Sequence, residues 1–300
     1  MRKKIGLISL GCSKNLVDSE NMLGLLERKG YKITDNIAEA NAIIVNTCAF
    51  IDSAKQESID AILDAARYKK EGKCKALICA GCLAERYKDE IMAELPELDG
   101  VVGVNDFNKI VSLVDKTLHG EKMQLFGGKG ELKAMPRMLA TPGYTAYIKI
   151  AEGCDNFCSY CAIPKIRGRY KSRGESSIMK EARRLTNSGV KEIILVAQDT
   201  SRYGLDKYGE KKLPELMRKL CTIEKLEWLR VHYCYPEEID DDLISAVRDE
   251  PKILKYLDIP IQHCNDRILK KMNRKTTGDD IRALIKHLRE EIPDVVITGA

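Results

Sequence analysis

Short apolar segments alternate with longer amphipathic segments along the first 118 residues. Apolar residues recur with helical spacing over 15–29, 52–68, 83–95 and 106–118. Between these stretches lie four short apolar runs typical of buried strands, at 4–10, 42–46, 76–80 and 101–104. Strands that alternate with helices in this way form a parallel sheet with helices on both faces. We therefore predict that residues 1–118 form an α/β domain with a doubly wound parallel sheet.

The pattern is interrupted between residues 119 and 143. This stretch is rich in glycine and proline, which end regular elements, and its apolar residues show no period. We predict that residues 119–143 form a linker.

A second alternating series follows over residues 144–300. Helical spacing is found at 176–188, 213–221, 239–248 and 279–290. The intervening strands are expected at 145–150, 192–197, 228–233, 256–259 and 295–298. Five strands with intervening helices predict a partial (β/α) barrel. A barrel sheet that ends there has an unpaired edge, so we expect a chain truncated at its carboxyl end.

Composition favours a cytoplasmic protein with no membrane partner. The 300 residues suggest two domains, and the net charge of +5 permits an anionic partner without requiring one. No apolar run approaches the roughly 20 residues of a membrane span. The first apolar run, 5–10, is shorter than the roughly 7–15 residues of a signal-peptide core. Eleven cysteines in a reducing compartment favour metal ligands or catalytic groups over disulfides.

Three cysteines lie close together after the first strand of the second domain. Cys154, Cys158 and Cys161 form a Cys-x₃-Cys-x₂-Cys motif. A loop at the carboxyl end of a barrel strand is where such folds carry their chemistry. Three thiolates can hold three of the four irons of a cubane cluster, and the amino and carboxylate groups of S-adenosylmethionine can bind the remaining iron. The motif therefore favours a [4Fe–4S] cluster that binds S-adenosylmethionine.

A structural zinc site is the alternative for this motif. Zinc sites usually pair one Cys-x₂-Cys with a second such pair, and no matching pair lies nearby in the sequence. The spacing of the three cysteines, with the aromatic residue Tyr160 just before the third, resembles the radical S-adenosylmethionine signature instead. The zinc alternative predicts a colourless, non-catalytic scaffold, for example one that binds nucleic acid.

Three further cysteines each follow a predicted strand of the first domain. Cys12, Cys48 and Cys82 are separated by 36 and 34 residues, and the carboxyl ends of parallel strands share one sheet edge. Gly11 and Gly81 precede two of them and permit backbone torsions that turn a side chain toward a shared centre. Lone cysteines are also common as small buried residues, so spacing alone leaves a second cluster open.

The other cysteines have no partner pattern. We expect Cys79 to point into the core from its strand and Cys74, between two lysines, to be exposed. Cys221, Cys234 and Cys264 are interpreted as packing residues.

The motifs together resemble the methylthiotransferase branch of radical S-adenosylmethionine enzymes. The resemblance covers nearly the whole chain and rests on Leu10-Gly11-Cys12, Asn46-Thr47-Cys48, Gly81-Cys82, the Cys154 loop, Ile163-Pro164-Lys165-Ile166-Arg167-Gly168 and Ser172-Arg173. It implies that Cys12, Cys48 and Cys82 hold a second [4Fe–4S] cluster. It also implies an amino-terminal cluster domain followed by a radical domain, with no catalytic residue beyond the clusters.

Two branches of that family differ in substrate. The stretch from Ser9 to Glu20, with Ser13-Lys14 in place of a Gln–Met pair, is similar to the RimO type. That type modifies an aspartate of small-subunit ribosomal protein S12. The pair Gln198-Asp199 also favours it, because the other branch tends to have Gln-Asn there. The alternative is the branch that modifies an adenosine in transfer RNA.

The resemblance also implies partners. They are ribosomal protein S12 or the small ribosomal subunit, and an electron donor such as flavodoxin or ferredoxin. Members of the family continue through a glycine-rich strand, close the barrel and add a small β-rich domain that contacts the substrate. This chain ends at Ala300, so we expect cofactor affinity and substrate docking to be affected.

Several side chains are candidates for contact with S-adenosylmethionine. Tyr160 is a candidate for the adenine or for loop packing, and Gln198 and Asp199 for a ribose or carboxylate contact or a turn cap. Arg173, with Arg167 and Arg169, is a candidate for binding an anionic group, although solvation is the favoured interpretation for all three. Four basic residues are expected to form a solvated face: Lys270, Lys271, Arg274 and Lys275.

Overall fold

The computed structural model of the chain describes residues 2–128, 130 and 132–299. Lys129 and Glu131 in the expected linker, and the outermost residues Met1 and Ala300 of the expected domains, lie outside the described residues. The chain forms two compact units. The first consists of the described residues up to 130 with Met135–Ala140 and Lys165–Arg167, and the second contains the rest.

The first unit is built on a six-stranded parallel sheet with the order β2-β1-β3-β4-β5-β6. Its strands are β1 (Lys4–Ser9), β2 (Lys32–Ile33), β3 (Ala42–Thr47), β4 (Ala76–Gly81), β5 (Gly100–Val102) and β6 (Met123–Leu125). Strands β3 and β4 are buried along their whole length, because helices cover both faces of the sheet. This confirms the doubly wound parallel sheet.

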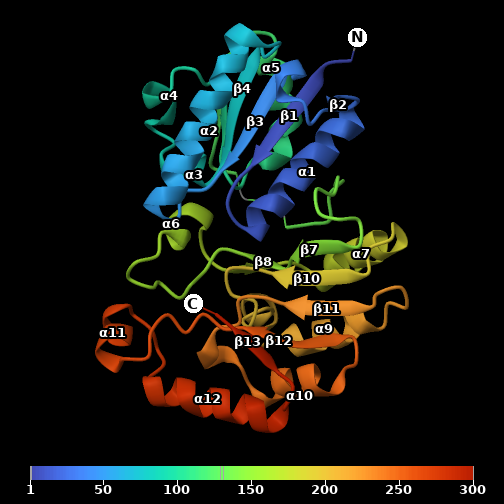
Figure 1. The fold of residues 1–300 in the computed structure, drawn as a ribbon, viewed down its shortest axis with the longest axis vertical. Coiled ribbons are helices and arrows are strands. Elements are labelled where there is room, and N and C mark those ends of the chain that lie inside the picture. Colours follow the sequence, from blue (N-terminus) through green and yellow to red (C-terminus); the bar gives the residue numbers. More distant parts are fainter. Residues whose placement is uncertain (1, 129, 131, 300) are drawn as a thin grey trace. The chain divides into compact units, whose positions relative to one another are not determined.

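The helices of the first unit divide between the two faces of the sheet (Figure 1). Helices α1 (Ser13–Lys29) and α5 (Ile110–Thr117) pack together against one face, where Met22, Leu26 and Leu113 join the apolar core. Helices α2 (Asp52–Glu71) and α3 (Cys82–Arg86) pack against β3 and β4. A short helix, α4 (Ile91–Glu94), follows α3.

Two expectations for the first unit were wrong. The helix expected over 83–95 is divided into α3 and α4, because the polar run 88–90 has no apolar side chain to pack. The stretch 119–143 is not only a linker, since β6 extends the sheet beyond β5. Its sequence, Met-Gln-Leu, is too short to show a period and is not a continuous apolar run, so this strand was not visible in the sequence.

Part of the expected linker also returns to helix α1. The carboxylate of Glu20 is fully buried and accepts hydrogen bonds from Arg137 Nε at 2.6 Å and from the Ala140 amide at 2.8 Å. The backbone of 136–137 passes so close to Gly24 that a Cβ there would lie 2.5 Å from the Arg137 nitrogen. A buried ion pair and a helix glycine therefore hold Met135–Ala140 in the first unit.

The second unit contains a five-stranded parallel sheet with the order β13-β12-β11-β10-β7. Its strands are β7 (Thr145–Lys149), β10 (Glu192–Val196), β11 (Trp228–Val231), β12 (Ile253–Asp258) and β13 (Val296–Thr298). Its longer helices are α7 (Glu175–Asn187), α9 (Leu213–Cys221), α10 (Asp241–Asp249) and α12 (Gly278–Glu291). Neighbouring helices contact one another in this order and form a layer along the sheet. The expected partial (β/α) barrel is confirmed.

Shorter elements connect the strands of the second unit. They are β8 (Ala151–Glu152), which pairs antiparallel with β9 (Lys171–Ser172), α6 (Ile163–Arg167), α8 (Leu205–Tyr208) and α11 (Asp266–Lys271). Residues Lys165–Arg167, at the carboxyl-terminal end of α6, belong to the first unit. Among the described residues, no helix is long and apolar enough to cross a membrane.

Candidate metal centres

The first group of cysteines lies at the ends of three adjacent strands. Cys12 follows β1 and caps α1, Cys48 follows β3, and Cys82 begins α3 directly after β4. Strand β3 pairs with β1 on one side and with β4 on the other, and Thr47 is in register with Gly81. The sheet therefore brings the three cysteines together, and Cys82 interacts electrostatically with both Cys12 and Cys48.

Two glycines permit this approach, as expected. Gly11 has φ +85° and Gly81 has φ +94°, both in the region that favours glycine. A Cβ on Gly11 would lie 3.2 Å from Cys48 Sγ, and a Cβ on Gly81 would lie 2.7 Å from the Thr47 carbonyl oxygen. The strand ends can pass this closely only because neither residue has a side chain.

Buried polar side chains join the three strand ends. The Asn15 amide donates to the carbonyl oxygens of Leu10 at 3.1 Å and Thr47 at 2.8 Å. The Thr47 hydroxyl donates to the Ala80 carbonyl at 2.6 Å, and the Ser58 hydroxyl accepts from the Cys48 amide at 3.0 Å. These bonds fix the backbone from which each cysteine projects.

Cations surround the first group of thiols. Burial raises the pKa of Cys12, but Lys14, Arg167 and backbone N–H groups outweigh it, so the pKa is lowered. Burial raises the pKa of Cys82, although Arg167 opposes this. Arg167 was expected to be solvated, but it is buried and its Nη2 lies 3.5 Å from Cys82 Sγ. Its acceptors are remote in sequence, so no local pattern indicated its burial.

The second group of cysteines occupies the loop between β8 and α6. Cys154 and Cys158 are buried and Cys161 is half-buried. Backbone N–H groups point at two of the sulfurs, from Asn156 to Cys154 at 3.5 Å and from Ile163 to Cys161 at 3.4 Å. Burial, with a smaller contribution from the other two thiols, raises the pKa of Cys154 to about 11. The three thiols are therefore neighbours on one short loop.

The second loop is held from both sides. The Asn156 side chain donates to Asp199 Oδ2 at 2.9 Å, and the Asn273 side chain donates to the Phe157 carbonyl at 2.9 Å. Phe157 has φ +49°, an uncommon value for a residue with a side chain. Arg274 was expected on a solvated face, but it is buried, with Nη1 3.9 Å from Cys158 Sγ.

The candidate cofactor contacts lie in different surroundings. Tyr160 is 46% exposed, and burial of its remaining surface raises its pKa to about 12. Gln198 donates to Glu152 at 3.4 Å, while its side-chain oxygen is buried and has no hydrogen-bond partner within the described part of the chain.

Asp199 and Arg173 have protein partners. Asp199 is fully buried, and its second carboxylate oxygen accepts from the Ser201 hydroxyl at 2.6 Å. Burial raises the Asp199 pKa to about 6. Arg173 is buried rather than solvated, because Glu181 pairs with it at 2.5 Å and the Lys149 carbonyl accepts from it at 3.3 Å.

Outside the two groups, the cysteines are dispersed. Cys79 is buried as expected, and burial raises its pKa to about 12. Cys74 was expected to be exposed but is buried, because the chain bends into β4 beside it and its Sγ donates to the Ala76 carbonyl at 3.3 Å. Cys234 is a packing residue, whereas Cys264 is exposed.

Each group offers three thiols, the number that a cubane cluster with one open iron takes from a protein. Among the described residues, no three Cys, His, Asp or Glu side chains are placed to hold one metal ion. A cubane cluster does not require this, because each thiolate binds a different iron. The N–H groups and buried arginines directed at the sulfurs also match the hydrogen bonds that such clusters receive.

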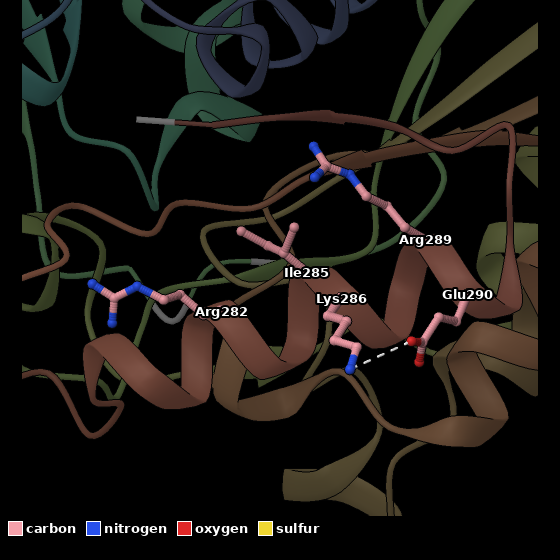
Figure 2. A pocket seen from close by; sticks show the side chains of 5 residues that line it. All are labelled: Arg282, Ile285, Lys286, Arg289 and Glu290. Atoms are coloured by element: carbon pink, nitrogen blue, oxygen red, sulfur yellow. Dashed lines mark ion pairs between the residues drawn. The ribbon is translucent and has the colours of Figure 1, made fainter.

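A hollow on the second unit lies apart from these residues in the sequence. It has a volume of about 420 Å³ and is lined by Arg282, Ile285, Lys286, Arg289 and Glu290 of α12 (Figure 2). The Lys286–Glu290 ion pair at 3.7 Å spans one turn of the helix. None of these residues was a candidate site residue.

Comparison with solved structures supports the fold. The chain is similar to the radical S-adenosylmethionine methyltransferase TsrM from Kitasatospora setae, with a TM-score of 0.68 and 13% identity over 99% of this chain and 67% of that one. It is also similar to the cobalamin-dependent S-adenosylmethionine radical enzyme OxsB, with a TM-score of 0.63 and 10% identity over 99% of this chain and 49% of that one. At these identities the likeness concerns the fold alone.

Sequence comparisons then define the family. Residues 148–300 match the Radical SAM superfamily, which sets the class of the protein, and residues 4–103 match the uncharacterized protein family UPF0004. The chain is 52% identical to proteins named ribosomal protein uS12 methylthiotransferase RimO from Lachnoclostridium phytofermentans and Caldicellulosiruptor saccharolyticus. Each comparison covers 98% of this chain, and 67% and 68% of those proteins respectively. The chain belongs to the RimO family of radical S-adenosylmethionine methylthiotransferases. S-adenosylmethionine and a [4Fe–4S] cluster are the cofactors that this class implies.

Proposed function

We propose that the protein attaches a methylthio group to the β-carbon of an aspartate in ribosomal protein uS12, using two [4Fe–4S] clusters. The observation that supports this most strongly is the presence of two separate groups of three cysteines, one in each unit. The similarity to RimO proteins over 98% of the chain supports the substrate. No comparable observation favours adenosine of transfer RNA or a zinc scaffold.

Cys12, Cys48 and Cys82 would hold the first cluster, and Cys154, Cys158 and Cys161 would hold the second, which binds S-adenosylmethionine. When bound, these groups supply the electron, the carbon-centred radical and the methylated sulfur that together replace a C–H bond by C–SCH₃. The protein contributes the binding, the orientation and the exclusion of water.

The surrounding side chains would orient the second cluster and its cofactor. The Gln198 oxygen is buried and can accept a hydrogen bond from a hydroxyl or amino group of S-adenosylmethionine. Tyr160 is exposed enough to stack against the adenine. Asp199 and Arg173 would act indirectly in cofactor binding, because Asp199 holds Asn156 of the cysteine loop and Arg173 holds the end of β7.

The partners follow from the same proposal. They are uS12, free or in the small ribosomal subunit, and a cytoplasmic one-electron donor such as flavodoxin or ferredoxin. Both uS12 and transfer RNA lie in anionic surroundings, so the charge of +5 does not separate them.

The cluster count tests the metal assignment. Anaerobic reconstitution should give about eight irons per chain, four for each cubane cluster. The triple variant Cys154→Ala/Cys158→Ala/Cys161→Ala should keep half of them. Loss of all the iron in this variant, or retention of all of it, contradicts two independent sites.

The substrate is tested in cells that lack the gene. Mass spectrometry of uS12 should show the loss of one methylthio group, while the nucleosides of digested transfer RNA stay unchanged. If the modified adenosine disappears and the mass of uS12 is unaltered, the transfer-RNA alternative is correct.

A further inference from the structure

Arg167 is a buried cation beside the first group of cysteines. It is the last residue of α6, belongs to the first unit and is 3% exposed. Its Nη2 lies 3.5 Å from Cys82 Sγ and donates to Asn15 Oδ1 at 2.6 Å. An arginine in this place has a rigid fork of N–H donors and keeps its charge at any physiological pH.

Neighbouring side chains fix the direction of this guanidinium group. Asp18 Oδ2 accepts from Nη1 at 3.3 Å and from Nη2 at 3.4 Å, and it holds the guanidinium group beside the sulfur. Asn15, the acceptor of Nη2, is itself bound to the carbonyl oxygens that end β1 and β3. The guanidinium is therefore anchored to the same backbone that carries the thiols.

Such a group acts on a cluster in a defined direction. Hydrogen bonds to the ligand sulfurs and nearby net charge are the main means by which a protein tunes the reduction potential of an iron–sulfur cluster. Reduction adds one electron and makes the cluster more negative. A buried cation that donates to a ligand sulfur therefore stabilises the reduced state more than the oxidised state.

We propose that Arg167 is a positioning residue that raises the reduction potential of the cluster held by Cys12, Cys48 and Cys82. It does so through its N–H···S hydrogen bond to Cys82 and its charge. The inference rests on the proposed function, because it takes that cluster to be present. The redox step is the entry of one electron from an external reductant into the oxidised cluster, and no covalent bond is broken.

The test isolates the first cluster. In the full chain, Cys154→Ala/Cys158→Ala/Cys161→Ala leaves one cluster, whose potential is measured by anaerobic dye-mediated titration with visible and electron paramagnetic resonance detection. Arg167→Gln is then compared with the charge-retaining Arg167→Lys. Arg67→Gln is the matched control, since Arg67 is 69% exposed on α2 and loses the same charge.

The expected result is a lower potential in Arg167→Gln with the iron content unchanged. A charge-assisted hydrogen bond changes an equilibrium constant roughly tenfold or more, so the ratio of reduced to oxidised cluster should fall about tenfold at a fixed potential. For one electron this is a shift of about 59 mV. Arg167→Lys should recover part of the shift, and Arg67→Gln should show none.

A second variant guards against misfolding, because Arg167→Gln removes the cation that lies 3.3 Å from the buried Asp18 carboxylate. Arg167→Gln/Asp18→Asn removes both charges and should show the same direction of shift. An unchanged potential in iron-loaded Arg167→Gln or in the double variant overturns the inference. So does loss of iron from both of them but not from Arg67→Gln, which would make Arg167 purely structural. If the cysteine triple variant itself binds no iron, the two-cluster proposal fails instead.

Discussion

Gly81 is the position where a single methyl group should most disturb the first centre. It ends β4 directly before Cys82, with φ +94° and ψ −149°. A Cβ at this residue would lie 2.4 Å from Asn46 Oδ1, 2.7 Å from the Thr47 carbonyl oxygen and 3.1 Å from the Thr47 nitrogen. Two of these atoms belong to the backbone of β3, which cannot move without breaking its pairing with β4.

The cost of Gly81→Ala has two parts. A residue with a side chain in this backbone region is strained by about 1–3 kcal/mol. Overpacking against fixed atoms adds about 1–3 kcal/mol. We therefore expect the substitution to lower the free energy of unfolding of the first unit by about 4 kcal/mol.

Gly30 provides a control for a glycine with a positive φ and free space around it. It also has a positive φ, +102°, but nothing lies within 4 Å of a Cβ built there. Gly30→Ala should therefore show the backbone strain alone, about 1–2 kcal/mol. Gly81, with ψ −149°, lies outside the left-handed helical region that Gly30 occupies with ψ 9°. The difference between the two variants therefore contains this extra backbone strain together with the steric part.

Hydrogen exchange in increasing urea, followed by mass spectrometry, gives the opening free energy of each unit separately. Peptides from β3 and β4 report on the first unit, and peptides from β10 and β11 should be unaffected. If Gly81→Ala costs no more than Gly30→Ala, the close approach of β3 and β4 at Gly81 is not what the substitution disturbs.

Two further predictions concern ion pairs. Arg137→Met leaves the fully buried Glu20 carboxylate without its cation and should cost about 3–5 kcal/mol in urea unfolding. Arg137→Met/Glu20→Met should recover most of that loss, and a double variant as unstable as the single one contradicts the argument. His287 Nε2 donates to Asp241 Oδ1 at 3.0 Å, and this hydrogen bond raises the pKa of His287 above the usual value of about 6.5. Its contribution to stability is therefore complete below pH 6.5 and is lost as the pH rises through the higher folded pKa. Titration by NMR should show this pKa fall in Asp241→Asn, and an unchanged pKa would refute the coupling.

The alternation of apolar and polar residues was sufficient to predict the two sheets. Long strands such as β3 and β4 carry continuous apolar runs because both of their faces are buried, and this composition is visible locally. The positions of the six candidate cysteines after strands or in a strand-end loop could also be predicted, because a chain that leaves a parallel strand must turn at the sheet edge. The short strands β2, β6 and β8 were missed because they lack the continuous apolar runs by which the equally short β5 and β13 were predicted.

Contacts between residues far apart in the sequence depended on the tertiary structure. Arg167 and Asn15 are separated by 152 residues, and Arg274 and Cys158 by 116. The sequence shows each arginine only as a polar residue in a polar neighbourhood, which is typical of a solvated side chain. Their burial follows from strand order and loop return, which bring a thiol, a carboxylate or a carbonyl oxygen next to the guanidinium and compensate for its lost hydration. A local pattern records how a segment folds, whereas the partners of a buried charge are decided by the packing of the whole unit.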